Sequence, residues 1–364
     1  MKYVDEFRDP TRLRRAANDL ARATTRPFTV MEICGGQTHT IARWALGDLF
    51  PAPLTVIHGP GCPVCVTPLE IIEAARAIAL RPGVILCSFG DMLRVPGESG
   101  DLLDARARGS DVRVVLSPLD AVRLAEATPD RHVVFFGVGF ETTAPATAMA
   151  AELARRRDLD NFSLLAAHVR VPPALELLLA SPSCRVQGLL AAGHVCTVAG
   201  TGEYPAIAAR FGVPIVVTGF EPLDILHGLT ILVRALEAGC CAVENQYTRS
   251  VRDEGNREAQ AMVDTVFAIA DRPFRGLGVV PNGGLRLREA YARWDAERRF
   301  DLSPSPIAES GRCRAAEVLQ GLLVPTACPE FGSGCTPDRP LGAPMVSNEG
   351  ACAAFFRYRR AARS

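Results

Sequence analysis

Short apolar runs alternate with amphipathic segments between about residue 26 and residue 245, and this alternation constrains the fold more than any other feature. The runs cover residues 28–33, 54–58, 84–89, 112–116, 133–138, 163–167, 187–191 and 214–218. Segments such as 69–80, whose apolar residues recur at helical spacing, separate them. This order predicts parallel sheets joined by crossover helices, because parallel strands cannot be joined by a tight turn.

The runs fall into two sets, which predicts an α/β protein with two similar lobes. Each lobe is expected to hold a parallel four-stranded sheet with flanking helices, the first at 25–125 and the second at 126–245. Residues 34–38 correspond in position to 139–143, and Gly90-Asp91 to Gly193-His194. Ligands of such sheets bind outside the carboxyl ends of the strands, so the predicted site is a cleft between the lobes.

The alternation stops after residue 245. A helix-like stretch at 254–270 is followed by a Gly/Pro-rich turn at 275–284 and by a proline-rich tail. We expect residues 246–364 to form a mainly helical or irregular region that carries a metal cluster, with residues 1–24 packed on it. Such a region has little core of its own and would gain stability from a bound metal.

Composition and charge exclude several classes of function. Forty basic residues balance forty acidic ones, so no basic field favours nucleic acid or an anionic membrane. Lys2 is the only lysine, which excludes a lysine-based phosphate loop and a Schiff-base lysine. The charged start of the chain is unlike a secretory signal, and no run approaches 18 apolar residues. We therefore expect a cytoplasmic protein.

Twelve cysteines remain to be explained. In a reducing compartment, clustered cysteines favour metal or redox chemistry over a disulfide framework. Cys62 and Cys65 have CxxC spacing between a predicted strand and helix, which suits thiol–disulfide chemistry, and the alternative is half of a zinc site. Cys34 follows another strand and precedes two glycines. If the lobes face each other, the three thiols share the cleft and could bind a soft metal or relay electrons.

Four further cysteines lie in the proline-rich tail: Cys313, Cys328, Cys335 and Cys352. Four thiolates suit either an iron–sulfur cluster or a zinc site. Their wide spacings differ from the paired CxxC halves of zinc ribbons, so the pattern favours a cluster. Unrelated thiols are the third interpretation.

Polar residues near the strand ends are further candidates for lining the cleft. They are Gln37, His39, Glu141, His168, His194 and Glu221. For the two glutamates the alternative is a structural helix cap, and for His168 and His194 it is an ordinary core or surface position. Most other cysteines, including Cys87, Cys184, Cys240 and Cys241, are expected to be inert.

Several motifs together resemble the hydrogenase maturation protein family HypD. They are Cys34-Gly-Gly-Gln-Thr-His39, His58-Gly-Pro-Gly-Cys-Pro-Val-Cys65, Phe89-Gly-Asp-Met-Leu-Arg-Val-Pro96, Gly139-Phe-Glu-Thr-Thr-Ala-Pro145, Gly219-Phe-Glu-Pro-Leu-Asp-Ile-Leu226, Glu244-Asn-Gln-Tyr247 and Met345-Val-Ser-Asn-Glu-Gly-Ala-Cys352. The resemblance covers nearly the whole chain, from about residue 3 to residue 358.

This resemblance implies a scaffold, with redox activity rather than conventional turnover, on which the Fe(CN)2CO group of nickel–iron hydrogenases is built. It implies a small partner chaperone, HypC, a cyanide donor, HypE, and one [4Fe-4S] cluster. Cys34 would bind the nascent iron centre together with a cysteine of the partner, and Cys62 and Cys65 would be the redox pair beside it. The four tail cysteines would hold the cluster and pass electrons toward that pair.

The chain departs from the family pattern in two places. Family members commonly have Cys-x-Cys-Gly-Glu where this chain has Cys313-Arg-Ala-Ala-Glu317, and often have a cysteine where it has Pro344. Both differences spare the four spaced cysteines. The rival function is an iron–sulfur-dependent disulfide reductase that uses Cys62 and Cys65, and a third reading is a zinc-stapled binding protein.

Overall fold

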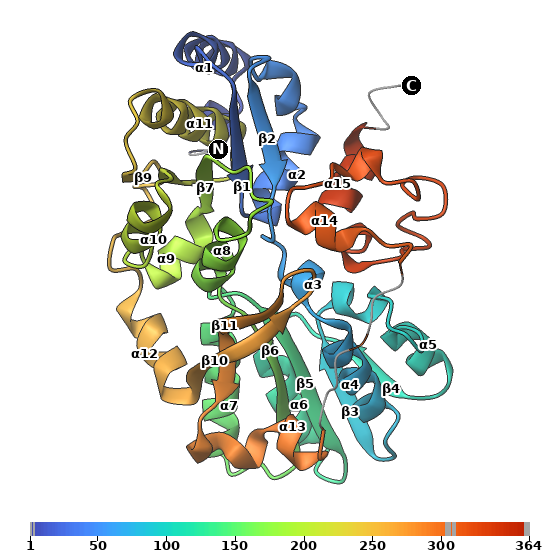
Figure 1. Ribbon diagram of the computed structural model, residues 1–364. Coiled ribbons are helices and arrows are strands. Elements are labelled where there is room, and N and C mark those ends of the chain that lie inside the picture. The colour runs from blue at the N-terminus through green and yellow to red at the C-terminus, as the bar shows by residue number, and fades with distance from the viewer. Residues whose placement is uncertain (1, 3, 303–306, 308–310, 360–364) are drawn as a thin grey trace.

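Two parallel sheets flanked by helices form the body of the protein (Figure 1). The structure is a computed structural model that describes residues 2, 4–302, 307 and 311–359. The first lobe has a five-stranded sheet of order β2-β1-β7-β8-β9, and the second a four-stranded sheet of order β4-β3-β5-β6. The expected α/β class with two lobes is confirmed, and the first sheet contains one strand more than expected.

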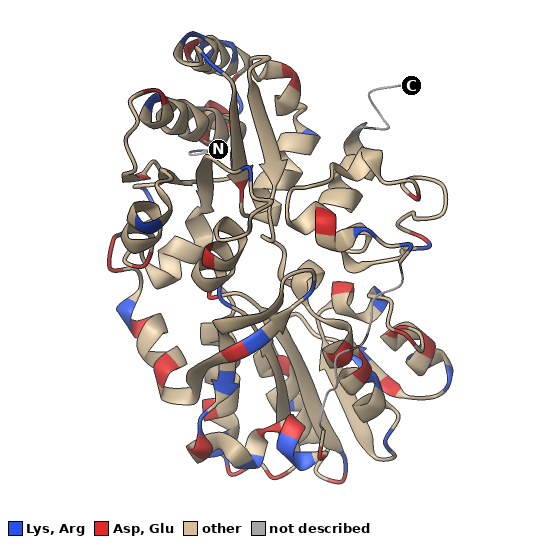
Figure 2. Ribbon diagram, in the orientation of Figure 1, with Lys and Arg blue, Asp and Glu red and all other residues tan. Residues whose placement is uncertain are grey.

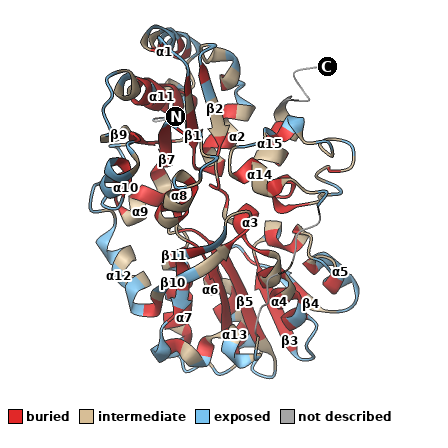
Figure 3. Cartoon of the chain, viewed as in Figure 1, coloured by how far each residue is buried: buried red, intermediate tan, exposed pale blue. Residues whose placement is uncertain are grey.

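Eight of the nine strands in the two parallel sheets coincide with the apolar runs to within one or two residues, and β9 has no corresponding run. The strands are β1 (Phe28–Glu32), β2 (Leu54–His58), β3 (Val84–Ser88), β4 (Asp111–Val114), β5 (His132–Gly139), β6 (Phe162–His168), β7 (Gly188–Ala192), β8 (Ile215–Thr218) and β9 (Val243–Asn245). Most strand residues are buried, because helices cover both faces of each sheet (Figure 3).

The helices follow the strands as crossover connections. They are α1 (Pro10–Ala23), α2 (Gly35–Arg43), α3 (Pro63–Val66), α4 (Leu69–Ala79), α5 (Leu102–Ala107), α6 (Pro118–Ala127), α7 (Ala144–Arg156), α8 (Val171–Leu179), α9 (Gly193–Ala199), α10 (Tyr204–Phe211), α11 (Pro222–Glu237), α12 (Arg257–Val266), α13 (Ala296–Arg299), α14 (Ala315–Leu319) and α15 (Ala351–Arg359). Short 3₁₀ helices are η1 (Asp5–Phe7), η2 (Leu46–Leu49), η3 (Gly90–Arg94), η4 (Glu289–Trp294), η5 (Pro325–Ala327) and η6 (Ala343–Met345).

The sheets divide the strands differently from the expected ranges 25–125 and 126–245. Strands β1 and β2 pair with β7, β8 and β9, whereas β3 to β6 form a sheet of their own. The second lobe is therefore inserted into the first, and the chain crosses between the lobes through α3–α4 and again through α8. An apolar run identifies a strand but carries no information about its neighbour, which is why the expected ranges do not describe the sheets.

The internal repeat is real, but its register differs from the expected one. In each sheet the first four strands in chain order lie in the order second, first, third, fourth. Cys34, which follows β1, therefore corresponds to Phe89 after β3, and not to Gly139 at the end of β5. Likewise Gly193 follows the third strand of its sheet, whereas Gly90 follows the first strand of the other.

The N-terminal helix packs on the first lobe. The expectation that residues 1–24 pack on the C-terminal region is therefore wrong for this helix. The buried face of α1 consists of Leu13, Ala16, Ala17 and Leu20. This face has helical spacing and packs against α11 in the same apolar cluster as Leu226 and Leu229. An amphipathic stripe predicts a buried face without naming the surface that covers it.

The segment 275–284, expected to be a Gly/Pro-rich turn, contains the turn and most of the second strand of a β-hairpin. Strands β10 (Phe267–Phe274) and β11 (Gly278–Leu287) pair antiparallel, with the tight turn limited to residues 275–277. A bridge between Val169 and Gly284 places the hairpin beside the end of β6. The apolar pattern did not predict this hairpin, because Pro273, the polar residues of both strands and a bulge between Ala270 and Arg272 interrupt it.

The C-terminal region contacts the first lobe beside α2 and reaches α3 through η6 (Figure 1). No helix among the described residues is long and apolar enough to cross a membrane. Basic and acidic residues are intermixed along the ribbon (Figure 2).

Candidate functional site

Cys34 lies at the start of α2, directly beyond the carboxyl end of β1. Its side chain is 1% exposed, and its carbonyl oxygen accepts the backbone N–H of Gln37 at 2.9 Å. A Cβ atom at Gly35 would lie 2.4 Å from Cβ and the carbonyl oxygen of Glu349. Glycine is therefore required there, because the C-terminal region passes directly over the first turn of α2.

His194 is the side chain that faces Cys34 from the neighbouring strand. It follows β7 in α9, and its Nδ1 and Nε2 atoms lie 3.6 and 3.9 Å from Cys34 Sγ. Strands β1 and β7 are adjacent where the strand order of the sheet reverses, which is where ligands bind in open α/β sheets. Burial lowers the pKa of His194 to about 4, so the imidazole is neutral at physiological pH.

The CxxC pair lies against the same backbone. The N–H of Gly35 donates to the carbonyl of Gly61 at 2.9 Å, which ties the start of α2 to the loop before Cys62. Cys62 and Cys65 are joined by a disulfide, and Cys62 Sγ accepts the N–H of Cys65 at 3.2 Å. The structure thus brings Cys34, Cys62 and Cys65 into one buried cluster.

Glu32 and His58 form a buried polar pair beneath Cys34 that the sequence reasoning did not select. One carboxylate oxygen of Glu32 accepts the N–H of Cys34 at 3.0 Å, and the other lies 2.5 Å from His58 Nδ1. Thr38 donates its hydroxyl to the same carboxylate. The sequence could have indicated both residues, because Glu32 and His58 are polar residues that each end an apolar strand just before one of the cysteine motifs.

The surroundings of Cys34 favour the protonated thiol. Burial raises its pKa well above the ordinary value, and the negative charges of Glu349 and Glu32 raise it further. The amides of Gly36 and Gln37 oppose this shift. A cation bound at the sulfur would replace the proton, because metal ligation requires the thiolate.

The C-terminal region closes one side of this site. His39 Nδ1 lies 3.2 Å from the carbonyl of Asn348, and its Nε2 lies 3.2 Å from the hydroxyl of Tyr358. The ring of Phe355 packs edge-on against His58 at 5.0 Å.

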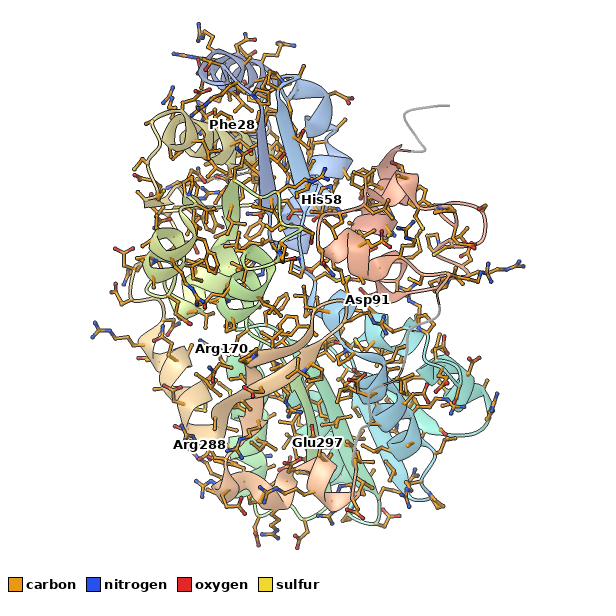
Figure 4. All side chains as sticks on the ribbon, viewed as in Figure 1. Phe28, His58, Asp91, Arg170, Arg288 and Glu297 are labelled. Carbon is orange, nitrogen blue, oxygen red and sulfur yellow. A yellow bond between two sulfur atoms is a disulfide. The ribbon has the colours of Figure 1, made fainter. Side chains whose placement is uncertain are left out.

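The C-terminal region also contacts the second lobe. Arg94 pairs with Asp91 and donates to the carbonyl of Val346. His58 and Asp91 mark the first-lobe and second-lobe sides of this junction (Figure 4).

The four tail cysteines surround one cavity. Cys313, Cys328, Cys335 and Cys352 all line this cavity, together with apolar residues such as Val318 and Met345. Burial raises the pKa of the Cys352 thiol, and the charges of the other three cysteines raise it further. Among the described residues, no three His, Cys, Asp or Glu side chains are arranged to bind a single metal ion.

The remaining candidates lie in different surroundings. Gln37 is buried in α2 and donates to the carbonyl of Ala191 at 3.2 Å. His168 is fully buried in the second lobe, with its Nε2 3.2 Å from the Thr147 hydroxyl, so it is a core residue. Glu221 is the N-cap residue of α11, and its carboxylate pairs with Arg8 at 2.5 Å. It therefore has the structural position that was the alternative to lining the cleft.

Glu141 lies where the two lobes meet. Its Oε1 accepts the N–H of Val171 at 2.9 Å. Burial raises the pKa of this carboxyl to about 7, while the charge of Arg170 opposes the shift. The position of Arg170 between the lobes is labelled in Figure 4.

Comparison with known proteins connects this site to a family. The profile described as "HypD: Hydrogenase formation hypA family" matches residues 11–359. The chain belongs to the HypD family. It is 47% identical to Hydrogenase maturation factor HypD of Azotobacter vinelandii over 99% of this chain and 97% of that protein. It is also 47% identical to the protein of the same name from Escherichia coli K12, over 99% of both chains.

HypD membership thus extends over the lobes and the C-terminal region alike. The HypD protein of Rhodobacter capsulatus is 45% identical over 98% of both chains. A conserved domain protein of Vibrio cholerae aligns with a TM-score of 0.14 and 11% identity, over 75% of this chain and 99% of that one. That likeness is too low to carry an argument about the fold.

Proposed function

We propose that this HypD-family chain is the scaffold on which the Fe(CN)2CO group of nickel–iron hydrogenases is assembled. The observation that carries the proposal is the position of Cys34. Its sulfur lies at the start of a helix, 3.6 Å from a neutral imidazole, and its backbone is tied to the CxxC loop. A thiol in this position can bind an iron ion that is the cargo of the site, because thiolates suit iron and the surrounding core excludes water.

The partners follow from the same proposal. A HypC-type chaperone would supply a second cysteine to the iron, and a HypE-type protein would donate cyanide. The junction of the two lobes and the C-terminal region is the surface at which such a chaperone would approach Cys34.

The cavity in the C-terminal region supports a [4Fe-4S] cluster as the resident cofactor. Cys313, Cys328, Cys335 and Cys352 would hold it. A cluster bound through four thiolates would require four cysteines around one pocket, and these four line the same one. The cluster would supply single electrons. The chain's own contribution is the Cys62–Cys65 pair, which takes up two electrons and two protons when its disulfide opens to two thiols.

The disulfide also favours a second candidate, an iron–sulfur-dependent disulfide reductase. Cys62 and Cys65 are 3% and 0% exposed, so an external protein disulfide could not reach either sulfur without opening the core. Their burial argues that the pair serves a group held inside the cleft. Turnover of a small exposed disulfide such as Ellman's reagent by the reduced protein would favour the reductase instead.

Anaerobic purification and infrared spectroscopy test the scaffold proposal. The chain should contain about four irons and four sulfides, and its complex with the small partner should show cyanide and carbonyl stretching bands. Cys34→Ala should remove the stretching bands and keep the cluster. Cys196→Ala is the matched control, because Cys196 is an equally buried cysteine in the same core cluster. Stretching bands of normal intensity in Cys34→Ala would refute the proposal.

A further inference from the structure

An aromatic ring holds the far side of the His194 imidazole. Phe220 follows β8, and its ring lies 4.9 Å from that of His194 with a tilt of 32°. A Cβ atom at Gly36 would lie 3.1 Å from Cδ1 of Phe220 and 3.6 Å from Cys34 Sγ. The ring therefore packs against both the imidazole and the turn that carries the thiol.

His194 depends on this contact for its orientation. Histidines beside a metal are usually held by a hydrogen bond from the second ring nitrogen to a carboxylate or a carbonyl. Among the described residues, the side-chain hydrogen-bonding neighbour of the His194 ring is Cys34 itself, on both nitrogens. Stacking on Phe220 is thus the contact that fixes the plane of the ring.

Phe220 is in turn held by a chain of contacts that reaches the N-terminal segment. Tyr247 meets Phe220 edge-on at 6.0 Å, and it fills the space above Gly193 and Gly219. The guanidinium of Arg249 lies 4.4 Å from the Tyr247 ring and 4.3 Å from the Phe7 ring.

Two ion pairs fix the ends of this chain. Arg249 donates through both terminal nitrogens to the buried carboxylate of Asp224, at 2.8 and 2.5 Å. Arg8, next to Phe7, donates two hydrogen bonds to Glu221, the residue after Phe220. Segment η1 is therefore attached to both Phe220 and Tyr247, through the Arg8–Glu221 pair beside the first ring and through Arg249 beside the second.

We propose that Phe220 is a positioning residue that holds the His194 imidazole against Cys34, and that η1 keeps Phe220 in place through Arg249 and Tyr247. The proposal rests on the proposed function in that Cys34 is the thiol that binds iron. It adds a role for a ring that has no atom able to bind iron, and for the first residues of the chain.

Site-resolved alkylation of the reduced, iron-free full-length chain tests the proposal. Iodoacetamide labelling, followed by peptide mass spectrometry, gives the rate at Cys34 and at every other thiol in one experiment. Phe220→Leu should raise the rate at Cys34 about two- to tenfold, which is the range expected for loss of one aromatic pair. Phe7→Leu should raise it less, and Phe220→Tyr should restore the wild-type rate because the ring is kept.

Two controls separate positioning from general loosening. Cys87 is fully buried in the second lobe, so its rate reports global opening and should not change. Phe300→Leu removes another ring that packs on a histidine, His132 at 5.6 Å, and should leave Cys34 unchanged.

An unchanged rate at Cys34 in Phe220→Leu would overturn the proposal. So would a parallel rise at Cys87, an equal effect of Phe300→Leu, or failure of the tyrosine variant to restore the rate. The assay contains no iron, so its result does not depend on whether the Fe(CN)2CO bands are found. The positioning role of Phe220 and the scaffold function can therefore fail separately.

Discussion

Replacing Gly61 by alanine tests the attachment between Cys34 and the CxxC loop. An added Cβ atom would lie 2.3 Å from the backbone nitrogen of Cys34 and 2.3 Å from the carbonyl carbon of Ile33. The atoms in contact are backbone atoms of a buried strand end, so they cannot rotate away as a side chain could. Because Gly61 does not have a positive φ, the clash alone opposes the substitution.

The magnitude follows from the displacement that the clash requires. Ordinary van der Waals contact begins near 3.4 Å, so the loop must move by about 1 Å. Overpacking of this kind costs about 1–3 kcal/mol. The movement also breaks the hydrogen bond between the Gly35 N–H and the Gly61 carbonyl, which adds about 1 kcal/mol. Gly61→Ala should therefore lower the free energy of unfolding by about 2–4 kcal/mol.

Urea unfolding followed by circular dichroism measures this loss. Gly202→Ala is the matched control, because a Cβ atom there would meet no atom within 4 Å. It should change the free energy of unfolding by less than about 0.5 kcal/mol. An unfolding midpoint of Gly61→Ala equal to that of the wild type would show that the two cysteine segments are not tied together as described.

Three further predictions concern other polar contacts. Glu32→Gln removes the carboxylate that accepts the N–H of Cys34 and pairs with His58. Urea titrations should show a free energy of unfolding lower by about 1.5–3 kcal/mol, and a change under about 0.5 kcal/mol would contradict this prediction. Hydrogen bonds from Arg155, with those from Tyr291 and Arg156, lower the pKa of Glu152 to about 2. Wild-type stability should therefore fall as the pH drops from about 4.5 to 2, and thermal melts of Glu152→Gln should show a smaller fall over the same range. Tyr358→Phe removes the contact with His39 and should speed amide hydrogen exchange in α15 about two- to tenfold, without changing exchange in β5.

The strands could be predicted from the sequence, but their arrangement could not. Buried parallel strands read as continuous apolar runs, and eight of them were located in this way. The pairing of β1 with β7 depends on the insertion of a complete second lobe between them, and no local pattern records that insertion. The hairpin was missed because its partly exposed, proline-containing strands have no such run.

The site was partly accessible from the sequence for a similar reason. Motifs mark residues whose chemistry is unusual for their position, and Cys34, Cys62 and Cys65 stand out in this way. Glu32 and Phe220 have ordinary types, and their roles arise from contacts between distant segments. Only the folded chain shows that Glu32 accepts from Cys34, or that Phe220 packs on His194.

The insertion of one lobe into the other sets an order of events during synthesis. The second lobe draws its four strands from residues 84–168, so it can fold while the rest of the chain is still being made. The five-stranded sheet cannot close until β7 emerges, because Val30 of β1 pairs with Gly188. Cys34 therefore acquires its histidine neighbour only after the inserted lobe is complete, and a growing chain carries this thiol without the enclosure that the finished protein provides.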